Sequence, residues 1–217
     1  MSASMSASMS ASMSASMSAS GRSEALMASG TAHGDAPVAA GLVYVVGPSG
    51  AGKDAVLGAL RASWPTGIAA HWARRTITRP ESAAGERHEA VDAAGFERLL
   101  AEGAFGLHWF AHGLCYGVRL SELESLALGQ WVFVTGSRGY VPQLLSRWSA
   151  ATVVHIGAAP EVLQQRLLAR GRETAAAQAA RLQRDPGLQL PAGSICIQND
   201  GALQAAADAL RARLLGC

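Results

Sequence analysis

The sequence predicts an α/β fold in which a central parallel sheet is flanked by helices. Three short apolar runs lead to this expectation, at 41–47 (GLVYVVG), 131–136 (WVFVTG) and 151–157 (ATVVHIG). Runs of this length without polar alternation are typical of strands that are buried on both faces. Each run is followed by a helical pattern, and strands that alternate with helices pair in parallel through right-handed crossovers. Ligands of such sheets gather at the carboxyl ends of the strands.

The chain begins with a low-complexity tail, which we expect to be disordered over residues 1–40. Its first 20 residues are five copies of MSAS, a repeat without an apolar face that could offset the entropy of ordering. A transit peptide is disfavoured, because Arg22 is the only Arg or Lys of the tail and such peptides are rich in arginine. One domain is expected to occupy residues 41–217.

Composition and charge argue against nucleic acid and membranes as partners. The formal net charge is +2 and the sequence has no basic run, whereas nucleic-acid-binding domains carry a strong basic patch. No apolar run approaches the about 18 residues that span a bilayer. Cys115, Cys196 and Cys217 lie far apart without metal-ligand spacing, which is typical of reduced thiols in a cytoplasmic protein. The oligomeric state stays open.

The first predicted strand runs into a glycine-rich loop of the G-x-x-x-x-G-K type, within GPSGAGKDAV at 47–56. A helix follows, with Val56, Leu57 and Leu60 on one face and Pro65 at its end. In this context, main-chain amides and the helix N-terminus surround nucleotide phosphates. The expected phosphate-binding residues are Gly47, Pro48, Ser49, Gly50, Ala51, Gly52, Lys53 and Asp54.

Lys53 is the only lysine among the 18 basic residues of the chain. Its ammonium group is a compact point charge on a thin stem, whereas the guanidinium of arginine is a wide planar fork. Its position in the loop predicts a catalytic residue that bridges the β- and γ-phosphates.

Asp54 departs from the usual loop pattern, which has a Mg²⁺-binding Ser or Thr after the lysine. The acid that completes such a site at a neighbouring strand end is missing too, because the run at 131–136 ends in Thr135 with no Asp or Glu nearby. Asp54 is therefore expected to be a catalytic residue that holds Mg²⁺ directly or through a bound water. The alternative is that Asp54 only caps its helix.

The segment at about 74–119 breaks the alternation of strands and helices and is predicted to be an insertion that binds the acceptor. It contains RRTITRP, a polar loop, one helix over 93–102 and GLCYG. Further along, the patterns predict a helix from Pro160 to Gly171, a strand at 194–199 (SICIQN) and a last helix over 202–215.

Arginines gather in the insertion and at strand ends. Arg75 and Arg79 flank TIT, Arg138 follows a strand, and Arg170 and Arg172 lie in ARGRE. One such arginine is more often a solvated surface charge, but together they suggest clamps on several phosphate groups.

No residue stands out as a general base for an alcohol acceptor. His88, His108 and His112 lie in the insertion, where each is more often structural. A phosphate acceptor would need no base, because its second pKa of about 6 leaves an oxygen ionised at neutral pH. Catalysis then rests on positioning and charge neutralisation.

These motifs together resemble the guanylate-kinase-like P-loop kinases, and within that group the ribose 1,5-bisphosphate phosphokinases of the PhnN type. The shared motifs are GKDAV at 52–56, ITR at 77–79, GERH at 85–88, HGL-x-YG at 112–117 and RGRE at 170–173. The similarity runs from about residue 42 to the C-terminus. One motif departs, because NGSR in that family stands here as TGSR, and Thr135 lacks the amide donor of Asn.

The resemblance implies a P-loop kinase fold with an acceptor-binding insertion and a lid at about 170–188. It implies that ATP, with Mg²⁺, phosphorylates ribose 1,5-bisphosphate to 5-phosphoribosyl 1-diphosphate, a reaction of phosphonate metabolism. Arg170 and Arg172 would reach from the lid toward the transferring group. The residues that would bind acceptor phosphates are Arg75, Arg79, Tyr116 and Arg138.

Two other functions stay open. A guanylate kinase or another nucleoside monophosphate kinase would carry the strand-end acid that is missing beside Thr135. A non-catalytic guanylate-kinase-like interaction module would tend to lose the phosphate loop, in which this chain has its only lysine.

Overall fold

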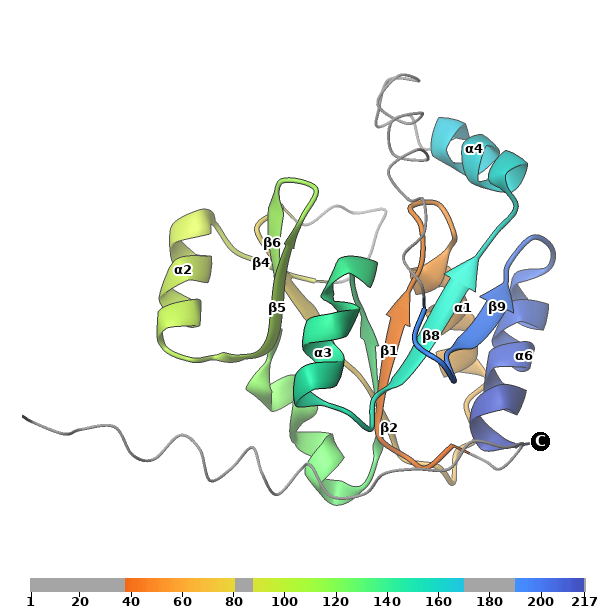
Figure 1. Ribbon diagram of the computed structural model, residues 1–217, viewed down its shortest axis with the longest axis horizontal. Helices are drawn as coiled ribbons and strands as arrows, with labels where there is room; N and C mark the ends of the chain where they lie inside the picture. Colours follow the sequence, from red (N-terminus) through yellow and green to blue (C-terminus); the bar gives the residue numbers. More distant parts are fainter. Residues whose placement is uncertain (1–37, 81–87, 170–189, 217) are drawn as a thin grey trace, which may run out of the picture.

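The computed structural model describes residues 38–80, 88–169 and 190–216. A five-stranded parallel sheet forms the centre, and a four-stranded sheet stands beside it (Figure 1). Helices cover both faces of the central sheet. The predicted α/β fold class is thereby confirmed.

The central sheet has the order β2-β7-β1-β8-β9, and all of its strand pairs are parallel. Its strands are β1 (Leu42–Val46), β2 (Ala70–Trp72), β7 (Trp131–Thr135), β8 (Thr152–Gly157) and β9 (Ile195–Gln198). Three of these, β1, β7 and β8, lie where the apolar runs predict strands, and β9 lies where a strand is predicted at 194–199. The exception is β2, whose three residues are too short to show a period and form a strand by pairing with β7.

Helices pack on the sheet according to the alternation of its side chains. Val43 and Val45 of β1 join the core under α1 and α6, whereas Tyr44 and Val46 point to the opposite face, where α3 and the second sheet lie. The helices are α1 (Lys53–Ala62), α2 (Ala93–Ala101), α3 (Val141–Arg147), α4 (Pro160–Ala169) and α6 (Leu203–Leu215), with the 3-10 helices η2 (Leu120–Leu128) and η3 (Arg138–Tyr140).

The second sheet has the order β4-β3-β6-β5 and comes from the segment predicted as an insertion. Its strands are β3 (Arg75–Ile77), β4 (Glu89–Ala90), β5 (Phe105–Ala111) and β6 (Leu114–Arg119). The helix expected at 93–102 is α2, which ends one residue earlier. In Figure 1 this sheet and α2 lie to the left of the carboxyl ends of the central strands, across from α4.

Two predicted segments lie largely outside the described residues, namely the tail up to residue 37 and the lid at about 170–188. Val38, at the end of the expected tail, donates its amide to the carbonyl of Leu214 (3.1 Å) and packs against the core. The helix expected to reach Gly171 is described as far as Ala169. Within the described ranges, no helix has the length and apolar character that crossing a membrane requires.

Candidate active site

The phosphate loop leaves the carboxyl end of β1 and leads into α1. Lys53 is the first residue of α1, and its Nζ donates to the carbonyl oxygens of Gly47 (2.9 Å) and Pro48 (3.1 Å). These bonds fold the side chain back over the loop and place its charge near the main-chain amides. A loop of this kind suits a bound anion.

Two glycines allow the loop to lie directly against the neighbouring strand ends. At Gly47, φ is 152° and a Cβ atom would lie 2.0 Å from the carbonyl oxygen of Ile156. At Gly52, φ is 81° and a Cβ atom would lie 2.6 Å from Nδ2 of Asn199. A side chain at either position would displace the loop, so the close approach of the main chain requires glycine at both.

Asn199 supports the loop from the end of β9, although no sequence motif indicates it. Its side chain is 3% exposed, and Nδ2 donates to the carbonyl of Ala51 at 2.8 Å. The two residues are 148 positions apart in the chain. In the sequence, the only feature that could have indicated this role is that Asn199 is a polar residue directly after the carboxyl end of a strand.

A hollow of about 350 Å³ opens beside the loop, with α4 and the start of α6 on its walls. Gly50, Gly52, Arg166, Asn199 and Leu203 are among its lining residues. Oδ1 of Asn199 and one guanidinium nitrogen of Arg166 are buried and have no hydrogen-bond partner among the described residues. Buried polar atoms rarely stay unpaired, so these atoms suit a ligand with a polar edge.

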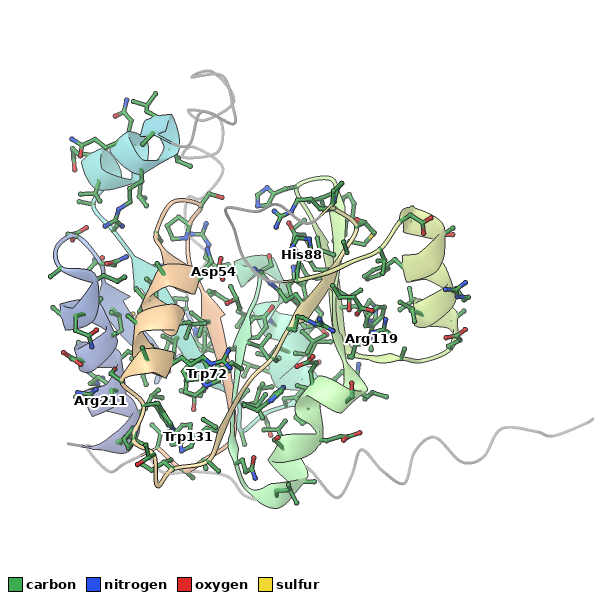
Figure 2. All side chains as sticks on the ribbon, turned by 180° about the vertical axis from the view of Figure 1, so that it is seen from behind. Asp54, Trp72, His88, Arg119, Trp131 and Arg211 are labelled. Atoms are coloured by element: carbon green, nitrogen blue, oxygen red, sulfur yellow. The ribbon has the colours of Figure 1, made fainter. Side chains whose placement is uncertain are left out.

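Asp54 lies in the first turn of α1 and faces the end of β7 (Figure 2). Its Oδ1 accepts a hydrogen bond from the hydroxyl of Thr135 (3.2 Å) and lies 3.7 Å from a guanidinium nitrogen of Arg75. The N-cap of α1 is Gly52, which has no side chain to cap the helix. The loop acid and the strand end without an acid are therefore in direct contact.

Arg75 begins β3 and is only 9% exposed. Its guanidinium lies over the ring of Tyr116, with 5.8 Å from Cζ to the ring centroid. A buried cation needs compensating partners, and the carboxylate of Asp54 and the face of Tyr116 supply two of them. Three of the predicted site residues therefore meet at one place between the two sheets.

Arg79 and His88 are joined through the main chain. Nε2 of His88 donates to the carbonyl oxygen of Arg79 at 2.9 Å, and His88 is 1% exposed (Figure 2). This contact supports a structural role for His88, which orders the chain after β3. His108 and His112 are exposed on the hairpin of β5 and β6.

An ion pair stabilises the second sheet behind Arg75. Glu89 accepts hydrogen bonds from Nε of Arg119 (2.9 Å) and from the hydroxyl of Thr76 (2.7 Å). The Arg119 guanidinium, helped by Thr76, holds the pKa of Glu89 below its usual value. These contacts join β4 to β3, which carries Arg75, and to β6, which carries Tyr116.

Basic groups also gather at the carboxyl end of the central sheet. Arg138 starts η3 directly after β7 and is half-buried, and this burial lowers the pKa of its guanidinium. His155 of β8 is half-buried as well, and its pKa is lowered by burial and by the positive charges of Arg138 and Lys53. A lowered pKa keeps the imidazole of His155 neutral at pH 7. No sequence motif indicates this residue.

Arg170 and Arg172, the two remaining predicted site residues, lie outside the described residues. Within the described part of the chain, no group of three or more His, Cys, Asp or Glu side chains could hold a metal ion.

Comparison with known proteins gives relatives along most of the chain. The chain is 43% identical over 180 residues to a ribose 1,5-bisphosphate phosphokinase PhnN of Pseudomonas paraeruginosa, covering 81% of this chain and 95% of that protein. It is 49% identical over 142 residues to a bifunctional ribose 1,5-bisphosphokinase-thymidine phosphorylase of Azorhizobium caulinodans, covering 65% of this chain but only 20% of that longer protein. No family model matches the chain.

A solved guanylate kinase from Anaplasma phagocytophilum has a similar fold. The TM-score is 0.58 over 81% of this chain and 85% of the kinase, at 18% sequence identity. At this identity the similarity concerns the fold alone, which agrees with the P-loop kinase fold expected from the sequence.

Proposed function

The chain belongs to the family of ribose 1,5-bisphosphate phosphokinases of the PhnN type, and from that premise we propose that it phosphorylates ribose 1,5-bisphosphate with ATP. An oxygen of the 1-phosphate attacks the γ-phosphorus of ATP, and the bond from that phosphorus to the β,γ-bridging oxygen breaks. The bridging oxygen leaves with ADP, and the other product is 5-phosphoribosyl 1-diphosphate. We expect the reaction to take place in the cytoplasm.

The contact of Asp54 with Thr135 and Arg75 carries this proposal. It joins the phosphate loop, the end of β7 and the first residue of the second sheet within 3.7 Å. A donor phosphate on the loop and an acceptor phosphate on Arg75 would therefore be neighbours, as in-line transfer requires.

The nucleotide would occupy the loop and the hollow beside it. The loop amides would surround the phosphates, and Lys53 would exchange its two carbonyl contacts for oxygens of the β- and γ-phosphates. The nucleobase would enter the hollow, where Asn199 and Arg166 offer buried polar atoms without partners among the described residues. Its volume of about 350 Å³ lies in the range of small-molecule sites.

Asp54 fits a role in holding Mg²⁺. Its side chain is 51% exposed, so the second carboxylate oxygen can be reached from solvent while Oδ1 stays bonded to Thr135. Mg²⁺ in kinase sites takes one or two carboxylates, with substrate phosphates and waters completing its shell. The ion would neutralise charge on the β- and γ-oxygens, and Asp54 would bind it directly or through water.

Arginines would bind the acceptor and remove the need for a base. Arg75, with Tyr116 beneath it, would hold one phosphate, and Arg79 and Arg138 would complete the acceptor contacts. The attacking phosphate oxygen is already ionised at neutral pH. We also assign Arg170 and Arg172 to the transferring group, from a lid at about 170–188.

One comparison of acceptors tests the function. Purified protein with ATP and Mg²⁺ should convert ribose 1,5-bisphosphate to 5-phosphoribosyl 1-diphosphate and should be slow with GMP. The products are separated by ion-exchange chromatography and ADP is measured by a coupled assay. Faster turnover of GMP would replace the proposal by a nucleoside monophosphate kinase, and no turnover of either acceptor would favour a non-catalytic module.

A further inference from the structure

A continuous line of aromatic rings runs from Arg75 to the turn that precedes Arg138, and both arginines are placed at the acceptor in the proposed function. The guanidinium of Arg75 lies over Tyr116, and the Tyr116 ring stacks on Trp109 with centroids 5.5 Å apart and an angle of 1° between planes. Trp109 then meets Tyr44 edge to face, at 6.2 Å and 83°. The line crosses from the second sheet, which carries Trp109 and Tyr116 as direct cross-strand partners, into β1 of the central sheet.

At the far end of this line, the hydroxyl of Tyr44 holds the turn that presents Arg138. It accepts a hydrogen bond from the amide of Ser137 (3.0 Å) and lies 3.4 Å from the Ser137 carbonyl, to which it can donate. The neighbouring residue must be glycine, because a Cβ atom at Gly136 would lie 2.0 Å from the Tyr44 oxygen. The main chain of the turn therefore lies directly on the phenol.

Tyr44 is an unusual choice for the central strand of a buried sheet unless its hydroxyl is used. The residue is 0% exposed, and the other four residues of β1 are Leu or Val. Burying a hydroxyl is unfavourable unless it is hydrogen-bonded, so a phenylalanine would satisfy packing alone. Burial also raises the pKa of Tyr44 far above its usual value, so the group stays a neutral phenol that can both donate and accept.

We propose that Tyr44, Trp109 and Tyr116 are positioning residues that set the spacing between Arg75 and Arg138, and thereby the spacing between the two phosphate subsites of the acceptor. Tyr140 braces the line, with ring centroids 6.3 Å from Tyr44 and 5.7 Å from Trp109. Stacked and edge-to-face rings in a packed core resist sliding, so the distance between the arginines is held by rigid groups. The inference rests on the proposed function for the identity of the acceptor.

The test compares Tyr44→Phe and Trp109→Leu with a control on the other face of the central sheet. Trp72→Leu is the control, because Trp72 stacks on Phe133 at 4.2 Å in the opposite core and lies well below Asp54 in the view of Figure 2. Steady-state kinetics are measured with ribose 1,5-bisphosphate and with ribose 1-phosphate, which lacks the second phosphate. Melting temperatures show how far each variant is destabilised.

We expect Tyr44→Phe and Trp109→Leu to raise KM for ribose 1,5-bisphosphate about tenfold, with KM for ATP nearly unchanged. KM for ribose 1-phosphate should change little, so the preference for two phosphates falls by the same factor. Trp72→Leu should lower the melting temperature and keep the preference. An equal rise of KM for both acceptors would overturn the inference. An equal fall of the preference for two phosphates in Trp72→Leu would overturn it too.

Hydrogen exchange tests the same inference without reference to the substrate. Amides of residues 135–140 should exchange faster in Tyr44→Phe and Trp109→Leu than in the wild type, and not in Trp72→Leu. Unchanged exchange in both site variants would overturn the inference even if the proposed reaction is observed. If the wild type does not phosphorylate ribose 1,5-bisphosphate but exchange is faster in both site variants, the proposed function fails while the positioning of residues 135–140 by the aromatic rings is supported.

Discussion

The central sheet and the second sheet both bring cations to the carboxyl ends of the central strands, but they hold these cations by different means. On the central sheet, main-chain atoms set the geometry, since Lys53 bonds to carbonyls of its own loop and Gly47 lies against a neighbouring strand. On the second sheet, side chains set it, since Arg75 rests on Tyr116 and Tyr116 on Trp109.

This difference separates the two tasks of a kinase. A loop of amides recognises phosphate groups that every nucleoside triphosphate shares, and it leaves little room for variation. A cluster of side chains can be altered one residue at a time, so the acceptor can differ between proteins of one fold. We therefore expect substitutions in the loop to lower kcat, and substitutions in the second sheet to raise KM for the acceptor.

The largest effect is expected at Lys53. Replacing Lys53 by Ala should lower kcat about 1000-fold, because its charge is proposed to stabilise the transferring phosphoryl group, and KM for ATP should change far less. Lys53→Arg is the matched variant and should also be slow, since a planar fork cannot follow the contacts of a point charge. Initial rates at saturating substrates measure both, and an unchanged kcat would remove the loop from the mechanism.

The next effect is expected at Arg75. Arg75→Ala should raise KM for ribose 1,5-bisphosphate about 30-fold, the loss of one charge-assisted contact, and should raise KM for ATP much less. Arg61→Ala, on the exposed side of α1, removes the same charge away from the site and serves as control. If KM for ATP rose as much as KM for the acceptor, the assignment of the second sheet to the acceptor would be wrong.

Asp54 stands between the two regions and should show a moderate effect. Asp54→Ser restores the usual loop pattern but leaves no acid at Thr135, so the Mg²⁺ concentration for half-maximal rate should rise about tenfold. Asp54→Asn keeps the shape without the charge and should behave similarly. Binding of Mn²⁺ with ADP, followed by electron paramagnetic resonance, gives a readout apart from turnover. Unchanged metal dependence in both variants would leave Asp54 only its structural contacts.

The smallest effect concerns stability of the second sheet. Glu89→Gln removes the pair with Arg119 and should cost about 1 kcal/mol at pH 7, or a few degrees of melting temperature. The bond from Arg119 holds the pKa of Glu89 in the folded protein below its usual value, so the stability advantage of the wild type is complete above the usual pKa and shrinks as pH falls through the folded one. Thermal melts of both proteins at pH 7 and at about pH 3 measure this, and a constant difference would contradict it.

The phosphate loop and several helices can be predicted from local sequence. The loop spacing and the position of Lys53 predict the strand, loop and helix that the structure shows, because these features depend on neighbouring residues. The helix at 93–102 is predicted almost to the residue for the same reason. Asp54 was expected to replace the acid that is missing at the end of β7, and its carboxylate does contact Thr135 there, while the role in Mg²⁺ binding stays a prediction.

The parts that sequence patterns do not indicate depend on contacts between distant residues. Asn199 reaches Ala51 across 148 positions, and Tyr44 reaches Ser137 across 93. β2 has no periodicity of its own and is ordered by β7. Side chains of this kind look like ordinary core or strand-end residues until the topology brings their partners beside them.

The single lysine of the chain has a practical consequence for spectroscopy. Protein produced with isotopically labelled lysine would contain one labelled side chain, and that side chain lies on the phosphate loop with its Nζ bonded to Gly47 and Pro48. Its resonances would need no assignment by mutation and would not overlap with others of their kind. Each addition of nucleotide, metal or sugar phosphate could then be followed by one signal that originates on the phosphate loop.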